Sequence, residues 1–377
     1  MTISKNLIKQ FSGDVIYFFS TLICVFFAKS QGNLKELGVF TSISFLMPVL
    51  GILLTFSRDT FLVKSYGLNQ KIKRIKKDTL LLNLGIISTT ILFIITTLAG
   101  LDGYLIVFGF LFGIVNSEYS QLRYRCKFGK YLETKFIHSL IFLTIYFVAW
   151  YLKYTNELVL ALFLSYSLVL LRIISFKYLK FLKKNLSFVK QIKQLKESIL
   201  QTFYGLISPT SSYLESIIIK TLFGLESLGV FGFFYYLLRG YTFAIQGLTR
   251  YYSVDLIKIF RSGTSRNNSS IIKLAMLNIA LCFGCLILGL IISAQKIYYL
   301  LCILTFILNF KNISAYFYFS RNKEGLLLII IAIFEILTII SIWLFSVSLE
   351  ALIFIKILIH AISLLTLLLK KHVIQNN

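Results

Sequence analysis

The residues of this chain that could do chemistry are ionisable side chains placed inside long apolar segments. They comprise four carboxylates, two cations and two histidines: Asp14, Glu118, Glu215, Glu335, Arg239, Lys356, His138 and His360. A charge at the centre of a membrane-spanning helix costs about 2.5–3.5 kcal/mol on insertion scales, so it normally has a partner or faces water. These residues are therefore the candidates for binding an ion or an ionic substrate.

Arg239 is the candidate that lies deepest in its apolar segment. It is about eleven residues from either end of the segment 228–249, which places it near the midpoint at a rise of about 1.5 Å per residue. In a water-filled cavity its planar guanidinium could hold a phosphate through two parallel hydrogen bonds. The alternative is a buried ion pair with a carboxylate such as Glu215. Both interpretations hold if a substrate displaces that carboxylate.

Aromatic residues beside Arg239 and basic residues at helix ends extend the candidate substrate site. Tyr235 and Tyr236 present flat aromatic faces that suit sugar rings, although most aromatic residues of such segments pack or face lipid. If Arg239 is structural, the phosphate site must be sought among Arg58, Lys220 and Arg250.

Asp14 and Glu215 are the candidates for binding a coupling proton or sodium ion. Asp14 lies about one turn inside the first apolar segment, so its carboxylate can reach the membrane interface at little cost. The alternative for Asp14 is therefore a structural role. Glu118 lies near the end of its segment and is followed by Arg123 and Arg125, which predicts a local ion pair.

The remaining polar residues of these segments are interpreted as packing residues. Glu335, His360 and Lys356 fall at similar depths in two neighbouring segments and predict a structural polar cluster, with a proton relay as the alternative. Cys282 and Cys285 form a lone C-x-x-C without a second pair or a histidine beside it, so we expect no metal ion and no disulfide.

The sequence lacks the motifs of the common enzyme classes. It has no Walker loop, no G-x-S-x-G, no D-x-D and no metal-ligand cluster. The loops predicted on the outer side are too short to hold an active site. We therefore expect that the chain is not an enzyme and needs no cofactor.

The elements that must position these residues are membrane helices, as the composition of the chain indicates. Apolar residues make up 57% of the chain, charged residues 14%, and the mean hydropathy is +0.82. Soluble domains have about 45–50% apolar and about 25% charged residues. A helix of about 20 residues crosses the bilayer core. By that length we predict twelve spans, at 10–28, 37–57, 79–99, 103–121, 136–152, 158–179, 199–221, 228–249, 271–293, 297–319, 326–346 and 350–369.

The distribution of charge predicts the orientation of these spans. The net charge is +24, and with both termini inside, the outer loops hold only Lys29, Lys35, Lys153, Lys220 and Lys296. Apart from Arg239 and Lys356 within spans, we place the other Lys and Arg residues on the cytoplasmic side, as the positive-inside rule requires. The basic stretch at 71–77 is interpreted as an anchor for anionic phospholipid, not as a nucleic-acid site.

An internal repeat divides the chain into two halves. The sequence Leu-Gly-Val-Phe at 37–40 recurs 191 positions later at 228–231, and each copy opens an apolar segment that ends in arginine. Six spans in each half return the chain to its starting side, so we expect parallel repeats. The predicted domains are an N-terminal six-helix lobe at 1–180, a basic amphipathic cytoplasmic linker at 181–198 and a C-terminal six-helix lobe at 199–377.

This arrangement resembles the flippases for O-antigen and other polysaccharide repeat units, within the multidrug/oligosaccharidyl-lipid/polysaccharide exporter superfamily. The resemblance rests on the 6+6 repeat, the Lys5-Asn6 start, Leu-Gly-Val-Phe opening two spans, and Arg123-Tyr124-Arg125 after span four. It implies an all-α membrane protein whose two lobes surround a central cavity that opens alternately to each side.

The resemblance also implies a function and partners. The expected substrate is a polyprenyl-pyrophosphate-linked oligosaccharide, moved to the outer leaflet of a bacterial inner membrane during lipopolysaccharide or other surface-polysaccharide biosynthesis. Protons or sodium ions would drive the transport. A polysaccharide polymerase and a chain-length regulator are the expected protein partners. A cation-coupled multidrug exporter of the same fold and a polytopic polymerase or glycosyltransferase are the alternatives.

Overall fold

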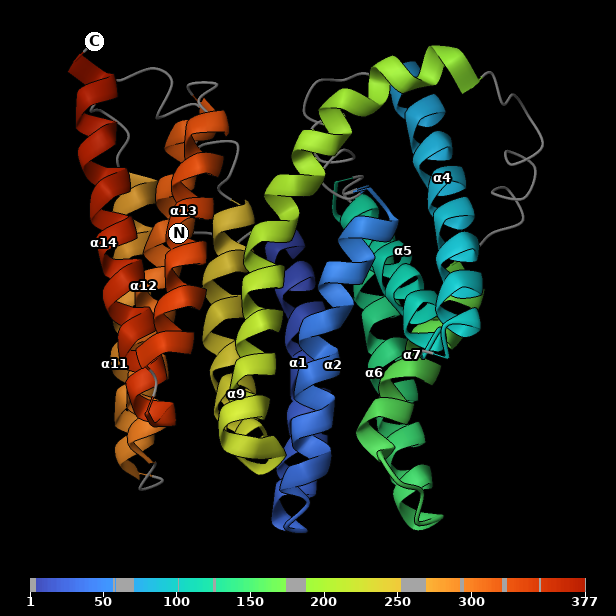
Figure 1. The fold of residues 1–377 in the computed structure, drawn as a ribbon, viewed down its shortest axis with the longest axis horizontal. Helices are drawn as coiled ribbons and strands as arrows, with labels where there is room; N and C mark the ends of the chain where they lie inside the picture. Colours follow the sequence, from blue (N-terminus) through green and yellow to red (C-terminus); the bar gives the residue numbers. More distant parts are fainter. Residues whose placement is uncertain are drawn as a thin grey trace. The chain divides into compact units, whose positions relative to one another are not determined.

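A computed structural model describes residues 5–56, 58, 71–100, 102–124, 127–173, 188–251, 269–291, 295–320, 324–345 and 347–376. Some side chains inside these ranges are not described, among them those of 71–80, 123–124, 188–201, 246–248 and 250–251. The described residues form eleven α-helices and no strand (Figure 1). This is the all-α fold predicted from composition.

The first half of the chain contributes α1 (Lys5–Ser30), α2 (Leu34–Leu54), α4 (Lys71–Leu98), α5 (Tyr104–Tyr124), α6 (Phe128–Tyr151) and α7 (Glu157–Ile173). The second half contributes α9 (Phe188–Tyr251), α11 (Ser269–Ile291), α12 (Lys296–Ser320), α13 (Glu324–Phe345) and α14 (Leu349–Asn376). Nine described stretches are long and apolar enough to cross a membrane. The chain is therefore a multi-pass membrane protein.

The longest element, α9, consists of two helices joined at Gly224. This glycine has φ 86° and ψ 170°, a backbone conformation that interrupts a helix and that glycine adopts without steric cost. The chain turns back there, so α9 supplies two spans (Figure 1). With α9 counted twice, the described helices match the twelve spans predicted from the sequence.

Short turns with left-handed residues join several of the helices. Gly32 and Gly100 adopt positive φ after α1 and α4, and Lys153 and Asn156 do so between α6 and α7. Such residues end a helix and reverse the chain within a few positions. The helices that they join therefore run antiparallel, as neighbouring spans of a membrane protein must.

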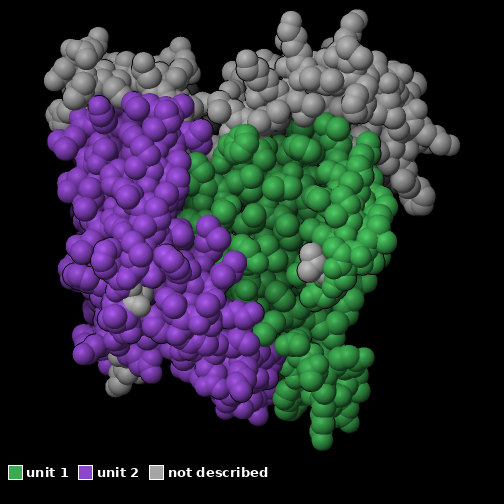
Figure 2. Space-filling model, viewed as in Figure 1, with its two compact units in different colours: residues 1–24, 39–213 green, residues 25–38, 214–377 purple. Residues whose placement is uncertain are grey.

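The chain divides into two compact units (Figure 2). Unit 1 contains Met1–Cys24 and Val39–Tyr213, and unit 2 contains Val25–Gly38 and Leu214–Asn377. Of the linker predicted at 181–198, residues 181–187 lie outside the described part of the chain. The remainder is the first part of α9, where the backbone is helical.

The two units repeat one pattern of helix packing. In unit 1, α5 packs against α4, α6 and α7, and α6 packs against α7. In unit 2, α12 packs against α11, α13 and α14, and α13 packs against α14. Taken in chain order, every one of these contacts in unit 1 has its counterpart in unit 2. This correspondence confirms the internal repeat predicted from the sequence.

The exposure of side chains is reversed relative to that of a soluble protein. Large apolar side chains are exposed along the helices, including Ile95, Met276, Phe283, Trp343 and Leu365. Charged side chains lie inside, and among the described residues these buried groups comprise Glu36, Arg58, Glu118, Lys135, Glu215, Lys311, Glu335 and Lys356. Lipid accepts an apolar surface, whereas an intramembrane charge needs a partner inside the protein.

Candidate functional site

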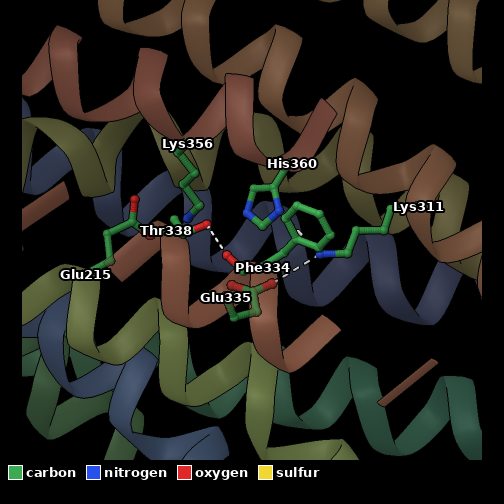
Figure 3. Close-up of polar contacts among 7 residues, drawn as sticks. All are labelled: Glu215, Lys311, Phe334, Glu335, Thr338, Lys356 and His360. Atoms are coloured by element: carbon green, nitrogen blue, oxygen red, sulfur yellow. Dashed lines mark hydrogen bonds and ion pairs between the residues drawn. The ribbon is translucent and has the colours of Figure 1, made fainter. Parts of the chain in front are cut away.

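Four helices of unit 2 bring together the charge cluster, which consists of Glu215, Lys311, Glu335, Lys356 and His360 (Figure 3). Glu215 comes from α9 before Gly224, Lys311 from α12, and Glu335 from α13. Lys356 and His360 lie one turn apart on α14, so their side chains share one face of that helix. All five side chains are buried.

The charge cluster contains two buried ion pairs. The Lys356 ammonium donates a hydrogen bond to Glu215 Oε2. The Lys311 Nζ lies 3.3 Å from Glu335 Oε1 and 3.3 Å from His360 Nδ1. An ammonium can only donate, so His360 accepts at Nδ1. The imidazole lies between the two lysine side chains (Figure 3). Each carboxylate of the cluster therefore has its own lysine.

One carboxylate oxygen of Glu215 is buried without a hydrogen-bond partner among the described residues. This oxygen is Oε1, whereas Oε2 binds Lys356. A buried acceptor without a partner normally costs about 1–3 kcal/mol, and more when it is charged. An oxygen of this kind can take up a proton or contact a small cation.

Arg239 lies between two aromatic rings on α9 after Gly224. Its guanidinium carbon is 5.5 Å from the centroid of the Tyr236 ring and 5.1 Å from that of Phe243. These rings come from positions three before and four after Arg239, which lie on the same helix face. The face of an aromatic ring attracts a cation that lies over it. Arg239 is half-buried.

The two candidate tyrosines differ in exposure. Tyr235 is 38% exposed, whereas Tyr236 is 2% exposed and packs beneath Arg239. Tyr235 therefore presents part of its ring at the surface of the chain, whereas Tyr236 is buried in contact with Arg239.

The three alternative candidates for binding phosphate are Arg58, Lys220 and Arg250. Arg58, which is 1% exposed, donates from Nη1 to Ser117 Oγ at 2.7 Å and from Nη2 to Glu118 Oε1 at 2.7 Å. Lys220 is exposed on α9 before Gly224. The Arg250 side chain lies outside the described part of the structure.

Asp14 belongs to a polar cluster within unit 1. The Tyr131 hydroxyl of α6 donates a hydrogen bond to Asp14 Oδ1 on α1. The Lys135 ammonium lies 4.6 Å from the centroid of the Tyr17 ring and 4.1 Å from that of Tyr119. The Asp14 carboxylate of α1 and the Lys135 ammonium of α6 are therefore both held by tyrosine side chains of unit 1.

His138 connects this cluster to α7. Its Nε2 is 3.2 Å from Ser165 Oγ, and the Ser165 hydroxyl donates to the Leu162 carbonyl at 3.0 Å. His138 therefore donates at Nε2, and its Nδ1 lies 2.8 Å from the Tyr119 hydroxyl oxygen. Both ring nitrogens of His138 thus have a partner within unit 1.

Two placements inferred from the sequence need correction. The charge pattern puts Lys311 and Lys135 on the cytoplasmic side, but Lys311 is buried within α12 and Lys135 within α6. Lys311 lies fifteen residues into its helix, or about 22 Å at a rise of about 1.5 Å per residue. A count of residues from the helix start could have revealed its depth.

Two expected pairings have a different form in the structure. Glu215, the carboxylate considered for Arg239, binds Lys356. Glu118 binds Arg58, which follows α2, whereas the side chains of Arg123 and Arg125 lie outside the described residues. Glu335, His360 and Lys356 form the predicted polar cluster, enlarged by Lys311 and Glu215. Among the described residues, no three His, Cys, Asp or Glu side chains are placed to hold a metal ion.

No protein-family model matches this chain, and no curated protein is similar to it in sequence. Solved structures are similar to it over nearly its whole length. The MATE multidrug transporter DinF-BH, solved as a complex, has a TM-score of 0.72 at 13% identity, with 98% of this chain and 96% of that chain covered.

Two conformations of a multidrug resistance MATE family transporter of the MOP superfamily are also similar. The outward-facing structure has a TM-score of 0.66 at 13% identity, covering 97% of this chain and 93% of that chain. The inward-facing structure has a TM-score of 0.62 at 12% identity, covering 100% and 97%. At these identities the comparisons establish the fold.

Proposed function

We propose that this chain, which has the fold of the MATE transporters, is an exporter of an anionic, pyrophosphate-linked lipid that carries an oligosaccharide. The substrate class is that of the polyprenyl-pyrophosphate repeat units of O-antigen and other surface polysaccharides. Transport runs from the cytoplasmic to the outer leaflet. On this proposal the protein lies in a bacterial inner membrane with both termini in the cytoplasm.

The observation that carries the proposal is the engagement of the intramembrane carboxylates. Within the described residues, Asp14 accepts from Tyr131, Glu118 from Arg58, Glu215 from Lys356 and Glu335 from Lys311. A carboxylate that already binds a cation or a hydroxyl is a poor receptor for a cationic drug. These pairings therefore count against a cationic drug, and Arg239 supplies the positive charge for an anionic substrate.

Arg239 is the residue that we assign to the pyrophosphate. Its guanidinium lies over the rings of Tyr236 and Phe243, which favour a cation at that position. A planar fork of N–H donors matches two phosphate oxygens, which a lysine cannot do. The exposed ring of Tyr235, one turn away on the same helix, is assigned to a sugar.

A cation-coupled multidrug exporter is the second candidate. The similar structures favour it, because they are described as multidrug transporters. For either substrate, a proton or sodium ion would drive transport. Glu215 is our first candidate for the coupling residue because of its unpaired Oε1, and Asp14 is the second.

The proposed partners follow from the substrate. Anionic phospholipid would bind the basic stretch at 71–77 on the cytoplasmic side. A polysaccharide polymerase and a chain-length regulator would receive the exported repeat units at the outer leaflet. No nucleic acid is involved in this scheme.

The test is complementation of a bacterial host that lacks its own repeat-unit flippase. We expect wild-type protein to restore surface polysaccharide. Arg239→Ala should lower it roughly 10–100-fold at normal membrane levels, since charged hydrogen bonds contribute about 1.5–3 kcal/mol. Arg239→Lys should retain partial function. Arg172→Ala, which removes an exposed cation of α7 in unit 1, is the matched control and should be fully active.

Two results would overturn the proposal. One is full activity of a well-expressed Arg239→Ala protein. The other is a wild-type protein that fails to restore polysaccharide and instead raises resistance to cationic dyes, which would favour the multidrug exporter.

A further inference from the structure

The two copies of the Leu-Gly-Val-Phe repeat pack against each other in unit 2. A Cβ atom added at Gly38 would lie 2.2 Å from the Leu225 carbonyl oxygen. One added at Gly229 would lie 2.1 Å from the Leu34 carbonyl oxygen. No side chain fits into either space, so the backbone of α2 touches the backbone of α9 after Gly224 at this point.

The residues on the two sides of this contact are equivalent positions of the internal repeat. Leu225 follows Leu34 by 191 positions, and Gly229 follows Gly38 by the same 191 positions. The Gly38–Leu225 contact is thus the repeat partner of the Leu34–Gly229 contact, and the distances agree to within 0.1 Å. A reciprocal contact of this kind arises where a two-fold axis passes between the elements that touch. The two stretches that touch, 34–38 and 225–229, are therefore related by a local two-fold axis within unit 2.

Side chains around the crossing join the same two helices. Lys35 Nζ lies 3.7 Å from Glu226 Oε1, and these positions are also 191 apart, so equivalent sites carry opposite charges and meet. Both side chains are exposed, at 75% and 64%. At the end of α1, the Lys29 ammonium lies 3.7 Å from the centroid of the Phe233 ring. The end of α1 and the start of α2 thus share one contact with α9.

This contact lies at the end of the helices where the connections are short. The turn between α1 and α2 covers residues 31–33, and Gly224 turns α9. The long basic segments 58–78 and 250–270 follow the opposite ends of the same helices. By the positive-inside rule, the short-connection end faces the outside.

We propose that the crossing of Gly38 with Gly229 is the outer gate of the transporter. The gate is closed in this structure and opens when the α1–α2 turn leaves α9. The proposal rests on the chain being an alternating-access transporter, whatever its substrate.

The chemistry of the crossing suits a contact that forms and breaks in each cycle. An exposed ion pair contributes about 0–1 kcal/mol. Close helix contacts through Cα–H groups and carbonyl oxygens contribute about 0.5–1 kcal/mol each. Glycines also leave no interlocking side chains that would have to change rotamer when the helices part. The crossing is therefore close enough to exclude a substrate and weak enough to open.

A reversible cross-link across the gate tests the proposal. In a chain whose native cysteines are replaced, Lys35→Cys with Glu226→Cys should form a disulfide under mild oxidation. The cross-linked protein should lose transport at least tenfold and regain it on reduction. The matched control is Glu133→Cys with Arg172→Cys, which replaces another exposed ion pair, between α6 and α7 of unit 1. This control disulfide should leave transport unchanged.

A second measurement needs no substrate. Leu228 is fully buried beside the crossing. A Leu228→Cys protein should react slowly with a membrane-impermeant thiol reagent added outside, and at least tenfold faster when Gly38→Leu holds the helices apart. If this rate changes while polysaccharide export is absent, the gate stands and the proposed substrate is wrong. If the disulfide-linked protein transports normally, or Gly38→Leu leaves the labelling rate unchanged, the crossing is not the gate.

Discussion

At the residue scale, the buried ion pairs are the features on which stability depends most. Two charges taken out of water together are tolerated only while each has its partner. Removing one partner of a buried pair costs about 3–5 kcal/mol, whereas an exposed pair contributes about 0–1 kcal/mol. The chain offers both kinds for comparison.

The Arg58–Glu118 pair should be essential for stability. Arg58 is buried against Glu118 and Ser117, so Arg58→Ala and Glu118→Gln should each cost about 3–5 kcal/mol. Arg172→Ala removes a similar but exposed contact with Glu133 in the same unit and should cost at most about 1 kcal/mol. Thermal unfolding in detergent measures all three. Equal melting temperatures for Arg58→Ala and Arg172→Ala would contradict the structural role of Arg58.

Glu215 and Lys356 allow stability to be separated from ion coupling. Lys356→Met alone leaves the Glu215 carboxylate buried without its partner, and we expect a large fall in melting temperature. Adding Glu215→Gln removes the stranded charge and should recover most of that loss. The double variant should still fail to transport if Glu215 is the coupling residue. A double variant that is folded and fully active would instead make the pair purely structural.

At the element scale, glycines decide which helices approach closely. On α5, a Cβ added at Gly113 would lie 2.5 Å from the Gly51 carbonyl oxygen of α2, and one added at Gly109 would lie 2.2 Å from Leu50 Cβ. The Gly109-x-x-x-Gly113 motif thus packs α5 on α2 within unit 1.

Gly113→Ala should therefore destabilise the protein by about 1–3 kcal/mol, because the close contact cannot hold another methyl group. Gly284→Ala on α11 is the control, since no atom lies within 4 Å of a Cβ placed there. That change should be neutral or slightly stabilising, given the low helix propensity of glycine. Thermal unfolding compares the two variants. The packing argument is wrong if Gly113→Ala is as stable as Gly284→Ala.

The helices themselves could be predicted from the sequence, but their partners could not. Hydropathy locates α2 at Leu34–Leu54 against a predicted 37–57, because lipid permits only apolar helices of that length. Hydropathy says nothing about how a helix is rotated about its axis. The pairing of Glu215 with Lys356, and not with Arg239, depends on that rotation. Nor does hydropathy show that Lys311 is buried within α12, because the apolar residues around it keep the mean hydropathy of the segment high.

At the scale of the whole molecule, the repeat and the charge asymmetry make one prediction about topology. Reporter fusions after residues 31, 102, 155, 224, 295 and 348 should report the outer side of the membrane. Those after 70, 128, 190, 262 and 322 should report the cytoplasm. Two adjacent reversals would mean that a predicted span does not cross the membrane.

The four-residue repeat is a weak signal in the sequence with a large structural consequence. Its two glycines, Gly38 and Gly229, meet in one backbone contact within unit 2, and equivalent helices in the two units have equivalent neighbours. The same symmetry does not extend to the charges. Unit 1 holds Asp14 with Tyr131 and Arg58 with Glu118, whereas unit 2 holds two lysine–glutamate pairs around His360.

The most direct test of the central claim is transport by purified protein in proteoliposomes. The substrate would be a short-chain polyprenyl-pyrophosphate-linked sugar with a fluorescent label, and a cationic dye would serve as the competing substrate. We predict that wild-type protein moves the labelled lipid between leaflets and leaves the dye in place. Arg239→Ala should slow this movement roughly 10–100-fold, while Arg172→Ala should not affect it. Movement of the dye, together with no movement of the pyrophosphate-linked lipid, would contradict the account.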